Sequence, residues 1–318
     1  MLDNLLFSLN STVPLFLVMA LGYVLRRTGF FDDSFVAAAN KLVFYVTLPV
    51  MLFSDLAGTD IYTSFDGRYV LFCAGATILS ITVIWGLAKL LLRDKSLVGE
   101  FVQACYRSSA AILGAAFIEN IYGSAGMSGL MILGSVPLYN IFAVLILALE
   151  SPSGAGTALR PRLRRSLRGI LTNPILLGIL CGFAASLLRL PQPAMLSSAL
   201  SSLARLTTPL ALLAIGAGFR GRAALGKLKL TAVASAVKLA VLPAVFLPLA
   251  VRLGFRDQQL VALLVMLGSI TTPSAYVMAR QMGYDGTLTG SVCVVTTVCS
   301  ALTLTLWLFL LHSLGCIA

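Results

Sequence analysis

Long apolar runs alternate with short polar connections along almost the whole chain. Each run has about 20 residues, which is the length that a helix needs to cross a hydrocarbon core of roughly 30 Å. Backbone groups in lipid must form their hydrogen bonds within their own segment, so the runs are predicted to be helices. We expect ten transmembrane helices, near residues 4–25, 36–57, 69–92, 98–121, 126–149, 169–188, 194–218, 229–252, 258–282 and 287–311.

The composition supports this interpretation. The 318 residues are 58% hydrophobic and 11% charged, whereas soluble domains carry roughly a quarter charged residues. The formal net charge of +11 would suggest a nucleic-acid partner if it were gathered on one soluble face. Because the basic residues fall in the connections between apolar runs, we expect a lipid bilayer as the partner and no nucleic acid.

The placement of the basic residues predicts the orientation of the chain. Most of the 23 lysines and arginines lie in or beside the odd-numbered connections, above all in residues 150–168. The positive-inside rule makes these connections cytoplasmic. Both termini are then extracytoplasmic, in a multi-pass protein of the cell (inner) membrane. Asp55, Asp60 and Asp66 are expected in the exterior second connection.

The two halves of the chain resemble each other at a constant shift of 160 residues. The shift pairs Pro14 with Pro174, Gly22 with Gly182, Thr47 with Thr207, and Pro49 with Pro209. Each half holds five predicted spans, and since five is odd, the second half must enter the membrane from the opposite side. We therefore predict a first five-helix repeat (1–149), a basic cytoplasmic linker (150–168) and an inverted second repeat (169–318). Inverted repeats are typical of secondary transporters, which bind substrate near the midplane between discontinuous helices.

Two matching spans are interrupted by polar residues. The fourth is interrupted from Arg107 to Gly114, and the ninth from Gly268 to Ala275. Pro273 suits the first position of a new half-helix with Thr272 as its N-cap, and the two serines at 108–109 are candidate caps in the first repeat. Two such helix ends would attract an anion. The alternative is an ordinary proline kink, with the hydroxyl groups bonded to carbonyls of the preceding turn.

Two cations lie deep within the predicted spans. Arg107 and Lys238 are functional candidates for that reason, and snorkelling of each to the cytoplasmic interface is the rival interpretation. Asn140, beside Tyr139, offers a polar group at similar depth, with an interhelical hydrogen bond as its alternative role. The candidate substrate-binding residues are Arg107, Ser108, Ser109, Gly114, Asn140, Lys238, Thr271, Thr272, Pro273 and Ser274.

Enzyme chemistry has no support in the sequence. The six cysteines are scattered singly and the one histidine, His312, lies at a span end, so we expect no metal site, no catalytic constellation and no enzyme activity. No acid that could carry a proton is expected at mid-membrane depth. We expect no cofactor, and either Na⁺ or H⁺ remains open as a coupling ion.

Three stretches resemble the auxin efflux carrier family in its shorter bacterial form. They run from Leu21 through Pro49, from Arg107 through Gly123, and from Pro273 through Leu304. The resemblance implies a fold like that of the bile acid–sodium symporters, with helices 4 and 9 broken and crossing. Spans 1, 2, 6 and 7 would form a scaffold, often dimeric, and spans 3–5 and 8–10 a mobile transport domain. Ser109 departs from the family pattern, where Asn is common.

The expected function is that of a secondary active permease, for efflux or uptake. The resemblance implies a small organic anion such as a carboxylate as substrate, moved by an elevator-like motion, in a protein that is a homodimer through its scaffold spans. Two alternatives are a sodium-coupled symporter of the bile acid type and a membrane sensor that binds through the same fold without transporting.

Overall fold

Helices make up nearly all the regular structure of the protein. The computed structural model describes residues 2–58, 66–110, 113, 115–122, 126–151 and 172–317. Outside the helices, these residues hold one isolated antiparallel bridge, between Ser108 and Thr271. The predicted all-α class is confirmed.

In the first half the helices follow the predicted spans closely. They are α1 (Leu2–Arg27), α2 (Asp33–Leu42), the π-helical turn η1 (Val43–Thr47), α3 (Leu48–Ala57), α4 (Gly67–Leu91), the short η2 (Lys95–Leu97), α5 (Val98–Tyr106), α6 (Ala115–Tyr122) and α7 (Gly126–Leu149). The linker predicted at 150–168 lies almost wholly outside the described residues, as do most residues of the second connection.

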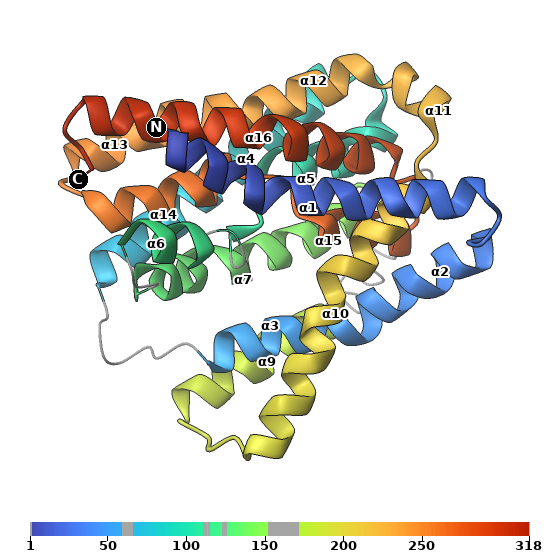
Figure 1. Ribbon diagram of the computed structural model, residues 1–318, viewed down its shortest axis with the longest axis horizontal. Coiled ribbons are helices and arrows are strands. Elements are labelled where there is room, and N and C mark those ends of the chain that lie inside the picture. Colours follow the sequence, from blue (N-terminus) through green and yellow to red (C-terminus); the bar gives the residue numbers. More distant parts are fainter. Residues whose placement is uncertain are drawn as a thin grey trace.

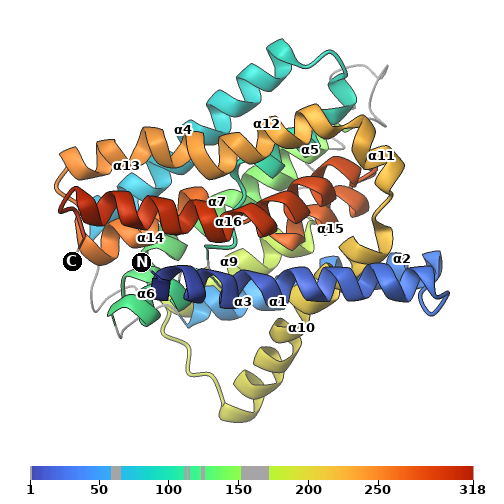
Figure 2. The ribbon, with the colours of Figure 1, turned by 45° about the horizontal axis from the view of Figure 1, so that its top comes forward.

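The second half also contains long helices, a π-helical turn and a broken helix. Its elements are α9 (Pro174–Leu187), α10 (Ala194–Gly218), the short α11 (Gly221–Gly226), α12 (Leu228–Ala236), the π-helical turn η5 (Val237–Val241), α13 (Leu242–Arg252), α14 (Asp257–Gly268), α15 (Pro273–Gln281) and α16 (Thr287–Ser313). In Figures 1 and 2, α1 lies beside α16, and α10 crosses α1 at a steep angle.

Several of these elements have the length and composition of membrane spans. Within the described residues, six helical runs are long and apolar enough to cross a bilayer: Asp33–Ala57, Gly67–Leu91, Met127–Leu149, Ala194–Gly218, Leu228–Arg252 and Thr287–Ser313. α9 and α14 are apolar but shorter. Large apolar side chains face outward along the longer runs, as Leu71 and Leu90 of α4 do at 73% and 80% exposure. Such surfaces suit contact with lipid and are too apolar for water.

Proline alone does not break these helices. Pro49 follows η1 and Pro243 follows η5, and in both places the helical run continues through the π turn. A proline has no N–H to donate and crowds the preceding turn, and a π turn makes room for it without ending the helix. Pro273 differs because the four residues before it are not helical.

The tightest helix contacts occur where glycines meet the backbone of a neighbour. α1 packs on α10 and α3 on α9. A Cβ added at Gly22 would lie 3.0 Å from the Cα of Leu213, and one added at Gly182 would lie 2.9 Å from the Cα of Phe53. The shift of 160 residues converts Gly22 into Gly182, and in the other direction Leu213 into Phe53. This exchange of partners is compatible with a two-fold relation between the halves.

Candidate functional site

The two interrupted helices meet at their interruptions. α5 ends at Tyr106 and α14 at Gly268, and the residues that follow run antiparallel, with the Ser109 N–H donating to the Ile270 carbonyl at 3.1 Å. The Thr271 hydroxyl donates to the Ala104 carbonyl at 2.8 Å. Backbone freed from the helices is thus paired again inside the protein, as it must be at membrane depth. Both predicted breaks are confirmed, and the ordinary-kink interpretation of the ninth span is wrong.

The predicted caps are only partly right. α15 begins at Pro273, with Thr272 in the extended conformation of an N-cap, as predicted. The Thr272 hydroxyl, however, makes no capping bond and lies 3.1 Å from the Ser274 hydroxyl. Ser108 is not a cap, because its hydroxyl donates to the Met266 carbonyl. Gly114 lies outside the described residues.

Lys238 closes the ends of both broken helices. It lies in η5 with no exposed surface. Its ammonium group donates to the Tyr106 carbonyl at 3.2 Å, to the Leu267 carbonyl at 2.8 Å, and to the Ser108 hydroxyl. The C-terminal ends of α5 and α14 carry partial negative charge, and the ammonium group stabilises both. Snorkelling of Lys238 to the cytoplasmic interface is therefore excluded.

Arg107 is buried beside this junction, with 2% of its surface exposed. Its Nη2 donates to Asn140 Oδ1 at 2.8 Å and to the Ser274 hydroxyl at 3.1 Å, and its Nη1 contacts the sulfur of Met278. Its Nε has no hydrogen-bond partner. Among the described residues no carboxylate lies within ion-pair distance of the guanidinium. Arg107 is therefore a buried positive charge held by neutral groups, and snorkelling is excluded for it as well.

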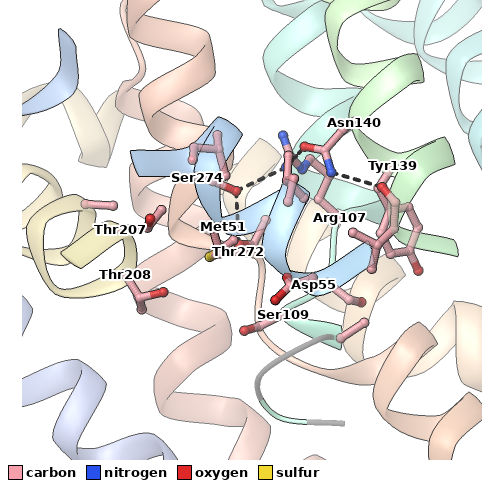
Figure 3. Close-up of a pocket in the computed structure, with 16 residues that line it drawn as sticks. Met51, Asp55, Arg107, Ser109, Tyr139, Asn140, Thr207, Thr208, Thr272 and Ser274 are labelled. Carbon is pink, nitrogen blue, oxygen red and sulfur yellow. Dashed lines mark hydrogen bonds between the residues drawn. The ribbon is translucent and has the colours of Figure 1, made fainter. Parts of the chain in front are cut away.

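A cavity opens in front of Arg107 (Figure 3). The first break lines it with residues 107–110, the second with Thr272 and Ser274, and α7 with Tyr139 and Asn140. α3 and α10 close the other side. The space that admits the centre of a water molecule measures about 40 Å³, enough for a few waters or a small ion.

Six predicted residues line this cavity: Arg107, Ser108, Ser109, Asn140, Thr272 and Ser274. Lys238, Thr271 and Pro273 stand behind it and hold the breaks in place. Asn140 also donates to the Val136 carbonyl at 2.9 Å, within α7. It therefore makes a hydrogen bond inside its own helix and also lines the cavity. Substrate binding by these residues stays a prediction.

The most important residue that the sequence prediction misplaced is Asp55. It lies in the last turn of α3 and not in the connection where it was expected, and it lines the cavity. Leu48, Met51, Leu52 and Asp55 all line the cavity, and their spacing puts them on one helical face. The spacing of these four residues was visible in the sequence, but Asp55 lies two residues from the predicted end of its span and was assigned to the connection.

Thr207 and Thr208 of α10 were also not predicted to line the site. The Thr207 hydroxyl is buried and has no hydrogen-bond partner within the described part of the chain. The match of Thr207 with Thr47 in the repeat was visible in the sequence, but the cavity that gives Thr207 its place is formed by distant segments.

Comparison with known proteins gives one finding about the whole chain. A family model described as "Membrane transport protein" matches residues 7–308. A search of curated proteins found no match.

Proposed function

The chain belongs to the membrane transport protein family, that of the auxin efflux carriers, and we propose that it is a secondary active transporter for a small organic anion such as a carboxylate. The family consists of transporters rather than enzymes, and with the apolar spans it makes the protein a multi-pass membrane permease. The substrate class and the mechanism are the proposal.

The observation that carries the proposal is the buried guanidinium of Arg107. Taking a charge out of water costs several kcal/mol unless an opposite charge or good hydrogen bonds offset it. Among the described residues Arg107 has neutral partners only, its Nε has none, and Arg107 lines the cavity. A carboxylate bound in the cavity would supply the missing negative charge and an acceptor for a charge-assisted hydrogen bond from the guanidinium.

The proposed architecture is that of ten spans in two inverted five-helix repeats. The exchanged contacts of Gly22 and Gly182 support the two-fold relation, and the meeting of the two breaks supports crossing helices. Both ends of the chain lie at the same end of the molecule in Figures 1 and 2, as an even number of spans requires. Both termini would be extracytoplasmic, in the cell (inner) membrane.

The position of the cavity favours an elevator-like motion. Its walls come from α3 and α10 on one side and from the breaks and α7 on the other. In the proposed division α1, α2, α3, α9 and α10 form a scaffold, through which the protein would be a homodimer. The remaining spans form the mobile domain, so substrate would bind at the boundary between the two.

Lys238 favours transport without sodium. A sodium-coupled symporter needs oxygen ligands near the breaks, from carbonyl and hydroxyl groups. The Tyr106 and Leu267 carbonyls and the Ser108 hydroxyl are oxygens of that kind, and the ammonium group of Lys238 binds all three. We therefore favour a sodium-independent carrier over the symporter of the bile acid type.

Counterflow in proteoliposomes tests the proposal. Vesicles loaded with one of a series of mono- and dicarboxylates should take up the same labelled compound, with or without sodium. Arg107→Gln should abolish the exchange. Arg205→Gln, which changes an exposed arginine of α10, should leave it intact. Binding that depends on Arg107 without any exchange would support the sensor instead, and exchange that persists in Arg107→Gln would refute the proposed site.

A further inference from the structure

The cavity that holds Arg107 also holds an acid. Among the described residues that line it, Arg107 and Asp55 are the charged ones, so this part of the wall carries one positive and one negative formal charge. Lys238 does not line the cavity, and its ammonium group donates to the Tyr106 and Leu267 carbonyls and to the Ser108 hydroxyl. A site built only for anions would not place a carboxylate in its wall, since like charges repel.

The two charges come from different parts of the molecule. Arg107 follows α5 and is fixed by Asn140 of α7 and Ser274 of α15. Asp55 projects from α3. The polar contacts of Arg107 are all with neutral groups, so Asp55 does not neutralise it by a direct ion pair. The cavity wall thus holds one positive and one negative group that do not form an ion pair with each other.

Hydroxyl side chains line the same cavity as Asp55. Figure 3 shows Asp55 and Ser109 in the lower part of the view, Arg107 and Asn140 above them, and Thr207 and Thr208 at the left, all lining the one cavity. An ammonium group has three donors and no acceptor, so a carboxylate among hydroxyl oxygens is suited to bind one. A carboxylate accepts about four hydrogen bonds, so Asp55 can keep its contacts within the protein and still accept from a ligand.

We propose that the substrate is a small zwitterion of the amino acid type. Its carboxylate would meet Arg107 and its ammonium group would meet Asp55, with the Thr207 hydroxyl, buried and without a partner, as a further contact. The space of about 40 Å³ favours a short side chain. This inference rests on the proposed function, because it takes the same cavity as the substrate site and specifies what binds there.

The test compares amino acids with the acids that lack only the amino group. Binding of glycine against acetate and of alanine against propionate would be measured with the purified protein, together with counterflow in proteoliposomes. The wild type should bind each amino acid at least about tenfold more tightly than its matched acid, a difference of about 1.4 kcal/mol. Asp55→Asn should remove that preference and leave the matched acid bound as before or more tightly.

A control variant and the melting temperature distinguish a loss of substrate specificity from a loss of folding. Asp33→Asn changes an exposed carboxylate at the start of α2 and should keep the preference. Asp55→Asn should melt close to the wild type, and Asp55→Glu should retain part of the preference for the zwitterion.

Each other outcome has a distinct meaning. A wild type that prefers propionate to alanine overturns the zwitterion and leaves the anion carrier standing. An Asp55→Asn variant that still prefers amino acids also overturns the zwitterion proposal. This holds even if the variant loses the pH dependence of its transport. If neither class of compound binds in a manner that depends on Arg107, the proposed function itself is refuted.

Discussion

Two regions of this molecule are held together by different forces. Where α1 meets α10 and α3 meets α9, glycines let one backbone touch the next, as at Gly22 and Gly182. Where the two breaks meet, contact is made by polar side chains, above all by Lys238 and Thr271. In lipid the first kind of contact depends on close packing and the second on satisfied polar groups. The glycine contacts suit a fixed support, and the polar junction suits a site that must bind a charge.

The largest effect is expected at the polar junction. Lys238→Met leaves the Tyr106 and Leu267 carbonyls buried without their donor. Each unsatisfied group costs about 1–3 kcal/mol, so thermal unfolding in detergent should shift strongly downward. Lys229→Met, at an exposed position, should melt like the wild type. Equal melting of the two variants would show that the ammonium group does not hold the helix ends.

A smaller loss of stability is expected at the glycine contacts. In Gly182→Ala the new methyl group meets the Phe53 backbone at 2.8–2.9 Å, and such overpacking costs about 1–3 kcal/mol. Gly75→Ala is the matched control, because nothing lies within 4 Å of a Cβ at that helical position. Alanine favours a helix over glycine by about 1 kcal/mol, so the control should melt slightly higher. Similar shifts in both variants would contradict the close contact.

Pro273→Ala should separate transport from stability. Proline at the first position of α15 fixes the backbone of a half-helix start, and alanine is tolerated there. Stability should change by less than about 1 kcal/mol, while counterflow slows because the break is held less firmly. Unchanged counterflow in a correctly folded variant would count against the broken helix as part of the transport site.

The smallest change in stability is expected for Thr207→Val. The Thr207 hydroxyl has no partner to lose, so unfolding should shift by about 1 kcal/mol or less, in either direction. Substrate affinity should nevertheless fall, since a polar contact to the ligand is removed. An affinity equal to that of the wild type would remove Thr207 from the site.

The features that the sequence predicted well are those set by local chemistry. Span lengths follow from the apolar runs, and the break at Pro273 follows from a proline preceded by Ser269 and two threonines. Asp55 and Thr207 could not be assigned in this way, because the cavity between α3 and α10 exists only after distant segments pack. The role of Lys238 was missed for the same reason, since its partners lie about 30 and 130 residues away along the chain.

The antiparallel pairing of the two breaks also bears on how the protein is made. The Ser109 N–H donates to the Ile270 carbonyl, and Lys238 donates to the Tyr106 carbonyl. The first half of the chain therefore leaves the ribosome before these partners have been synthesised. Until residue 270 has entered the membrane, the break in the fourth span has a backbone N–H group, that of Ser109, without its hydrogen-bond acceptor. Fragment 1–149 made alone should therefore be degraded, and synthesis of both halves as separate chains should rescue it.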